Sequence, residues 1–200
     1  MTETENTISD RLYAALELAF RLHGRDARKS SRAPVMAHLL SVCAMVQHES
    51  DDEDEAVAAL LHDALEDKPN DGKTREEILE RFGERVLRII EISTDTPPDY
   101  MGGPKPEWKL RKQAYIDHIR ETDPGLLRVT VADKVDNARA ILADHRQVGD
   151  EVWQRFTTRS KMDQQWYYTK SLEAYDVVRF KGGNAGGFKA VGRENQRTLT

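Results

Sequence analysis

Residues 58–68, AALLHDALEDK, place one histidine and three carboxylates inside an otherwise apolar run. On a helix, His62 lies four positions before Glu66. The same spacing separates Asp63 from Asp67, so the polar side chains share adjoining parts of one face. Leucine and alanine cover most of the remaining surface, and burying an imidazole beside three carboxylates is costly unless something pairs with them. A divalent cation is the simplest such partner.

A single His–Asp pair on a helix is more often structural or exposed than a metal site, so further ligands must come from elsewhere. His38 and Asp133 are the candidates, on two other segments with helical patterns. Asp133 lies in the mostly apolar stretch VTVADKVDN, whereas a histidine with apolar neighbours, such as His38, is more often a satisfied core residue than a ligand. A ligand set of oxygen and nitrogen without cysteine suits Mn, Fe, Mg-like or Zn ions.

The bulk composition favours a soluble protein with a heavily charged surface. Two hundred residues suit one domain, the apolar fraction is 38% and the charged fraction is 32%. No apolar segment is long enough to cross a bilayer and the N-terminus is unlike a signal peptide, so we expect a cytoplasmic protein without a membrane partner. The net charge of −5 argues against nucleic-acid binding, and the lone Cys43 permits no internal disulfide.

Apolar spacing predicts an all-α chain. Ser9 is a plausible N-cap for the first helix, Gly24 its end, and Thr74 with Glu77 a capping box. We expect residues 1–8 and 181–200 to be flexible and residues 9–180 to form one domain. The expected helices cover about 9–23, 36–47, a third carrying 58–68, 74–81, 86–93, 107–121, 126–145, and 151–180 with a break near Thr157.

Two segments leave alternatives open. Residues 21–32, RLHGRDARKSSR, are either a solvated helix end or a local anion-binding site. The loop 96–106 contains four prolines and two glycines, and is either a lid or binding element or a plain surface excursion. The basic residues near it could bind phosphates: Lys105, Lys109, Arg111 and Lys112.

The order of the candidate ligands resembles the His…His-Asp…Asp metal-binding pattern of the HD-domain phosphohydrolases. The resemblance is closer to the RelA/SpoT-type branch, which hydrolyses the alarmone ppGpp, and to its small single-domain relatives. It covers roughly residues 10–145. The family motif H-x-G-x-x-R-K is matched by His23-Gly24 with Arg28-Lys29, at a spacing one residue wider, and HD-x-x-ED is matched by His62-Asp63 with Glu66-Asp67. Phe82, Gly83 and Val86 match FG-x-x-V. Val131 to Val135, with Asn137 and Arg139, match L-A-D-R-L-x-N-x-R.

The resemblance implies a compact HD-domain helical bundle over residues 9–180 that acts as a metal-dependent phosphohydrolase of a small nucleotide. It implies one divalent metal, with Mn as the first choice, and (p)ppGpp 3′-pyrophosphate hydrolysis as the activity. The implied metal ligands are His38, His62, Asp63 and Asp133. The implied catalytic acidic pair is Glu66 and Asp67, and the implied substrate-binding residues are Arg28, Lys29, Lys134 and Asn137.

Departures from the family pattern, among them the loop 96–106 and the aromatic C-terminal stretch, leave the choice of substrate open. Leu39 stands where the family has proline after the first histidine, and Lys134 stands where it has arginine, which removes a bidentate fork. The alternatives are an HD phosphatase or pyrophosphatase of another nucleotide (dNTP or NADP-type) and a non-catalytic nucleotide-binding regulator. A homo-oligomer, and the place of the aromatic C-terminal helix in the site or an interface, are left open.

Overall fold

The computed structural model describes residues 8–28 and 33–181, and this part of the chain is helical, as predicted. Its one β-type pairing is an isolated bridge between Ala27 and Pro34. None of its helices is long and apolar enough to cross a lipid bilayer. The α-helices are α1 (Asp10–His23), α2 (Val35–Glu49), α3 (Glu53–Leu61), α4 (Ala64–Asp67), α5 (Lys73–Phe82), α6 (Glu84–Ser93), α7 (Trp108–Glu121), α8 (Arg128–Val148) and α9 (Lys161–Lys181), with 3-10 turns η1 (Asn70–Gly72), η2 (Pro124–Leu126) and η3 (Gly149–Arg155).

The first group of helices surrounds α3, which packs against α1, α2 and α6. Every residue of α3 from Glu55 to Leu61 is buried, because small alanines let its neighbours approach closely on several sides. Val129 and Ala132, near the start of α8, join the same apolar cluster. The first core therefore fixes the positions of three helices that carry candidate ligands: α2, the end of α3, and α8.

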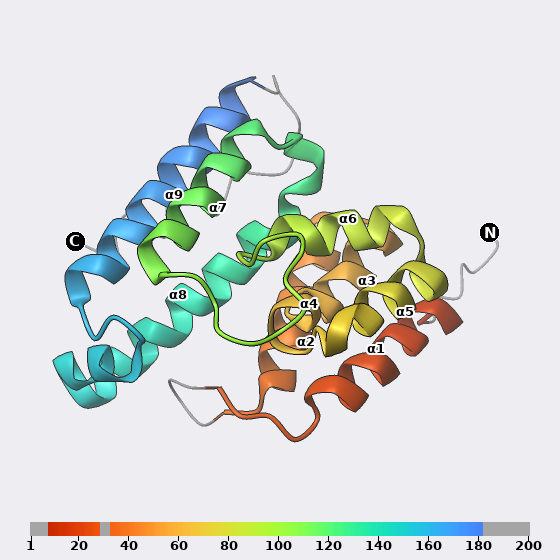
Figure 1. Ribbon diagram of the computed structural model, residues 1–200, viewed down its shortest axis with the longest axis horizontal. Coiled ribbons are helices and arrows are strands. Elements are labelled where there is room, and N and C mark those ends of the chain that lie inside the picture. The colour runs from red at the N-terminus through yellow and green to blue at the C-terminus, as the bar shows by residue number, and fades with distance from the viewer. Residues whose placement is uncertain (1–7, 29–32, 182–200) are drawn as a thin grey trace, which may run out of the picture.

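The second group consists of α7 and α9, which pack against each other on the far side of α8 (Figure 1). Its core is richer in aromatic residues than the first core. The buried members are Ile92, Tyr115, Ile116, Ile119, Leu127, Tyr167, Ala174 and Val178. Figure 1 shows α8 running between the two groups, so residues on opposite faces of α8 meet different cores.

Two local predictions about helix starts had different outcomes. The Ser9 hydroxyl accepts a hydrogen bond from the Leu12 amide at 3.0 Å, which confirms the predicted N-cap of α1. The capping box at Thr74 is wrong: Gly72 precedes α5, and the Thr74 hydroxyl donates to the Lys68 carbonyl instead. Glu77 forms ion pairs with two arginines rather than reaching back to the helix start.

The continuous helix predicted over residues 58–68 is interrupted. α3 ends at Leu61 and α4 begins at Ala64, with His62 and Asp63 in the turn between them. The apolar spacing continues through this turn, so it gives no signal of the break. The predictions of flexibility for 1–8 and 181–200 lie outside the described residues, apart from residues 8 and 181.

The loop between α6 and α7 lies against the turn that follows α4. Gly72 has a φ of +84°, and a Cβ built there would lie 3.2 Å from the Met101 Sδ. A Cβ on Gly102 would lie 3.7 Å from the Pro69 ring. In Figure 1 this loop passes beside α4. The 96–106 segment is therefore packed near the acidic residues of α4.

Candidate metal centre and active site

Three segments bring four candidate ligands toward one point. His38 lies on α2, His62 and Asp63 lie at the junction of α3 and α4, and Asp133 lies on α8. The two Nε2 atoms are 3.2 Å apart. Asp133 Oδ1 is 3.2 Å from His38 Nε2 and 3.6 Å from His62 Nε2. Asp63 places one carboxylate oxygen 3.4 Å from His62 Nε2 and the other 3.8 Å from His38 Nε2.

The outer nitrogen of each imidazole already has an oxygen partner. His62 Nδ1 lies 2.8 Å from the Ala59 carbonyl, and His38 Nδ1 lies 2.6 Å from Asp136 Oδ2. An Nδ1–H that donates to oxygen leaves the lone pair on Nε2 facing the centre. Two such lone pairs 3.2 Å apart repel each other unless a positive charge lies near them. With the carboxylates beside them, these donors fit a divalent cation that accepts nitrogen and oxygen ligands.

The electrostatics of the four residues favour a positive charge at the centre. Burial lowers the pKa of His38, but hydrogen bonds to Asp133 and Asp136 outweigh it and raise the pKa to about 9. Burial likewise lowers the pKa of His62, and Asp63 and Asp133 raise it further than burial lowers it. A proton and a metal ion compete for such a site.

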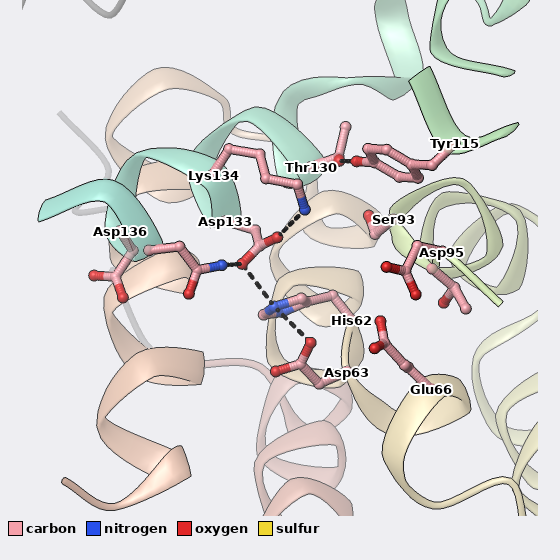
Figure 2. Close-up of polar contacts among 12 residues, drawn as sticks. His62, Asp63, Glu66, Ser93, Asp95, Tyr115, Thr130, Asp133, Lys134 and Asp136 are labelled. Carbon is pink, nitrogen blue, oxygen red and sulfur yellow. Dashed lines mark hydrogen bonds and ion pairs between the residues drawn. The ribbon is translucent and has the colours of Figure 1, made fainter. Parts of the chain in front are cut away.

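Asp133 directs its two oxygens to different partners. Oδ1 faces the histidines, and Oδ2 accepts a hydrogen bond from Lys134 Nζ at 2.5 Å (Figure 2). Burial by itself raises the pKa of Asp133, but Lys134 and the two histidines hold it well below its ordinary range. The predicted substrate-binding role of Lys134 stays a prediction, and its contacts in the structure are with protein groups.

Arg28 and Asn137, two predicted substrate-binding residues, lie together beside the centre. The Asn137 amide donates to Asp133 Oδ1, and its carbonyl oxygen accepts from the Arg28 guanidinium. Arg28 also lies 3.2 Å from Asp136 Oδ2. Lys29 lies outside the described residues. The segment after α1 thus brings a cation to the edge of the candidate metal centre, next to a partly buried carboxylate.

Glu66 and Asp67, the predicted catalytic pair, face the loop that precedes α7. Lys105 Nζ lies 2.7 Å from Glu66 Oε1 and 3.7 Å from the Asp67 carboxylate. Burial and the nearby charge of Asp95 raise the pKa of Glu66, and Lys112 and Lys105 offset only part of this rise. A carboxylate with a raised pKa is suited to take up and return a proton near neutral pH. Asp67 is exposed to solvent.

Sequence reasoning missed two functional candidates, Asp136 and Asp95. Asp136 fixes the orientation of His38 and accepts hydrogen bonds from Ser41 and Arg28. The Asp95 side chain is 3% exposed and pairs with Arg111 and Lys112. Burial alone raises the pKa of Asp95, but Lys112 and Arg111 outweigh it and lower the pKa to about 2. The signal for Asp136 was its place three residues after Asp133, next to the motif asparagine.

Comparison of the chain with known protein families gives one clear match. The model of the HD domain matches residues 15–162, which include all four candidate ligands and both acidic residues of α4. The chain belongs to the HD-domain family. Almost all of α9 lies beyond the matched residues.

Individual relatives of this HD domain are larger proteins. The present chain is 32% identical over 136 residues to the guanosine-3′,5′-bis(diphosphate) 3′-pyrophosphohydrolase of Aquifex aeolicus, and the aligned part covers 66% of this chain and 18% of that protein. It is 27% identical over 127 residues to the Haemophilus influenzae protein of the same name, covering 58% and 17%. The chain therefore spans less than a quarter of the length of these curated relatives.

Two solved structures share the fold of this HD domain. A structure reported for a metazoan SpoT ortholog that hydrolyses ppGpp superposes with a TM-score of 0.72 at 23% identity, covering 97% of this chain and 99% of that chain. The structure of lmo0812 from Listeria monocytogenes EGD-e gives a TM-score of 0.65 at 26% identity, covering 81% and 96%. Both coverages show that the HD-type helical fold extends over most of the present chain.

Proposed function

We propose that this HD domain is a metal-dependent phosphohydrolase of a small nucleotide, and that it removes the 3′-pyrophosphate of (p)ppGpp. The observation that carries the proposal is the convergence of two buried imidazoles and two carboxylates from three segments of the chain. The choice of substrate is supported by the relatives named for guanosine-3′,5′-bis(diphosphate) 3′-pyrophosphohydrolysis. In this reaction, water attacks phosphorus and the bond to the ribose 3′ oxygen breaks; that oxygen takes up a proton, and the products are pyrophosphate and guanosine 5′-diphosphate or 5′-triphosphate.

His38, His62, Asp63 and Asp133 would hold one divalent metal ion, with Mn²⁺ as the first choice. His38, His62 and Asp133 are buried and offer ligand atoms within 4.8 Å of one another, and Asp63 adds a carboxylate at their more exposed side. When bound, such an ion lowers the pKa of coordinated water and polarises a phosphoryl oxygen. Asp136 and the Ala59 carbonyl keep the two rings oriented for that role.

Glu66 is proposed as the group that takes the proton of the attacking water. Glu66 lies in α4, four residues after His62 and three after Asp63, and its pKa is raised. General bases of this kind contribute about 10²- to 10⁴-fold to a rate. Asp67 and Glu66 together hold the Lys105 ammonium, which can stabilise negative charge on the pyrophosphate group.

Arg28, Lys29 and Asn137 are proposed to bind the nucleotide. The guanidinium of Arg28 has five N–H donors, more than its contacts with Asp136 and Asn137 use, and its planar fork matches phosphate oxygens. The basic segment after α1 is then an anion-binding site rather than a solvated helix end.

A nucleotide panel tests the function. Purified protein with Mn²⁺ is incubated with ppGpp, dGTP and NADPH, and the release of pyrophosphate and of phosphate is measured separately. We expect pyrophosphate from ppGpp, abolished by EDTA and by His62→Ala. Faster product release from dGTP or NADPH than from ppGpp would identify a different substrate. Nucleotide binding without any product would indicate a non-catalytic regulator.

A further inference from the structure

Asp133 offers only one of its oxygens to the candidate metal centre. Its Oδ1 lies 3.2 Å from His38 Nε2, whereas its Oδ2 is bonded to the Lys134 ammonium at 2.5 Å. The Asp133 side chain is 6% exposed, so water cannot easily replace the lysine at Oδ2. Carboxylates bind metal ions through one oxygen or through both. An ammonium bound to Oδ2 keeps that oxygen out of the ligand sphere.

Lys134 is held in place from its other side by aromatic residues of the second core. Its Nζ lies 4.9 Å from the centroid of the Tyr115 ring on α7, within the range of a cation–π interaction. The Tyr115 hydroxyl bonds to Thr130 and lies 3.3 Å from the Tyr175 hydroxyl on α9. The rings of Tyr115 and Tyr167 are also 6.4 Å apart. Figure 2 shows Lys134, Thr130 and Tyr115 on the side of Asp133 away from His62.

We propose that Lys134 is a positioning residue that, held by Tyr115, which itself lies against Tyr175 of helix α9, keeps Asp133 a one-oxygen ligand and so leaves a coordination position for solvent. The inference rests on the proposed function in that it requires a divalent ion among these ligands. Catalytic metal sites keep such an open position, whereas a position filled by a second carboxylate oxygen is closed. Lys134 also balances one carboxylate charge among the several at the centre.

This role gives the aromatic C-terminal helix a part in the chemistry. Almost all of α9 lies beyond residues 15–162 matched by the family model, yet the Tyr175 hydroxyl on α9 lies 3.3 Å from that of Tyr115, the ring that Lys134 faces. Without Lys134, Asp133 Oδ2 would be a buried oxygen lacking its charged partner, which is costly. Rotation toward the metal ion would relieve that cost.

The test counts the solvent molecules on bound Mn²⁺ by water-proton relaxation, with Mn²⁺ alone as the probe. A six-coordinate ion with four protein ligands keeps about two solvent positions, so Lys134→Met should lower the relaxivity per bound Mn²⁺ by about half. In ppGpp hydrolysis, kcat should fall about 10- to 100-fold while KM stays near the parent value. Lys134→Arg, which keeps a cation, should recover most of the relaxivity.

Lys161→Met is the matched control, because Lys161 also lies over an aromatic ring and near a carboxylate, 5.9 Å from the Trp153 centroid and 3.5 Å from Asp150 Oδ1. It should leave the relaxivity at the parent value. If Lys134→Met does not fold, Tyr115→Leu removes the ring and should also lower the relaxivity. Tyr115→Phe keeps the ring and should not, since Thr130 and Tyr175 can still bond each other at 3.3 Å.

Unchanged relaxivity in folded Lys134→Met would overturn the proposal. So would a raised KM at parental kcat and relaxivity, because that result assigns Lys134 to substrate binding. Relaxivity is measured without substrate, so the two proposals can fail separately. A parent protein that binds Mn²⁺ but hydrolyses no nucleotide would refute the proposed function. A lower relaxivity of Lys134→Met in that case would still support the positioning role. A parent protein that binds no Mn²⁺ would overturn both.

Discussion

The two sides of the molecule contribute different groups around the candidate metal centre. The elements packed on the first core supply the histidines and the carboxylates His38, His62, Asp63 and Asp133. The α7–α9 side and the loop before it supply Lys105, Arg111 and Lys112, whose partners are the carboxylates of Glu66 and Asp95. Asp133 turns Oδ1 to the histidines and is paired with Lys134 of its own helix at Oδ2, whereas Glu66 and Asp95 are paired with cations from the α7 side. Separate cores allow each set to be oriented independently.

Removing a metal ligand on the first core should have the largest effect. His62 is 1% exposed, so His62→Ala both deletes a donor atom and leaves a cavity. We expect metal content to fall to background and ppGpp hydrolysis to fall at least about 10³-fold, because the ion supplies much of the chemistry. Metal analysis and pyrophosphate release measure the two effects. A folded variant that still binds one equivalent of Mn²⁺ would remove His62 from the site.

The next largest effect concerns Glu66, where the two sides meet. Glu66→Gln keeps the size of the side chain but cannot take up a proton. We expect kcat to fall about 10²- to 10⁴-fold with metal content unchanged. Single-turnover hydrolysis together with metal analysis separates the two quantities. Activity equal to that of the parent would exclude Glu66 as the base.

The cation-rich side is probed by Asp95→Asn. Because the folded-state pKa of Asp95 is about 2 and the ordinary value is 3.8, the ionised carboxylate stabilises the fold above pH 3.8. This contribution is lost as the pH falls from 3.8 to about 2. The difference corresponds to about 2 kcal/mol at pH 7.

Urea unfolding of the parent and of Asp95→Asn, at pH 7 and at several values below pH 4, tests this sign. The variant should be less stable at pH 7, and the gap should narrow as the pH falls. Equal stability of the two proteins at pH 7 would show that the Asp95 cluster does not stabilise the fold.

The smallest expected effect is at Arg28, at the edge of the first core. Arg28→Lys keeps a positive charge near Asp136 but loses the planar fork. We expect KM for ppGpp to rise about ten-fold, equivalent to about 1.4 kcal/mol, with kcat and metal content near the parent values. Steady-state kinetics measure the change. If KM is unchanged, Arg28 serves only as the partner of Asp136.

Sequence patterns predicted much of the helical fold because apolar spacing reports which face of a helix is buried. The buried side of α8, including Val131, Val135 and Ala138, follows that spacing. The break at His62 was missed because neither glycine nor proline marks it and the apolar run continues. The Thr74 capping box failed because a tertiary partner, the Lys68 carbonyl, takes up the hydroxyl that a local rule assigns to the helix end.

Residue types and their order in the sequence predicted the candidate metal ligands. They did not predict the side chains, distant in sequence, that contact and orient the site. Asp95 follows an apolar helix but belongs to no motif, and only the fold shows that α7 brings Arg111 and Lys112 to it. Asp136 resembled an ordinary helix residue until α2 placed the outer nitrogen of His38 against it. Such contacts depend on tertiary packing, which a single sequence does not specify by pattern.

Anomalous diffraction at the manganese edge, from crystals of the parent protein soaked in Mn²⁺, shows where the ion binds. We expect one strong peak within bonding distance of both Nε2 atoms of His38 and His62 and of the Asp63 and Asp133 carboxylates. The absence of a peak there, or a peak bound only elsewhere on the molecule, would contradict it.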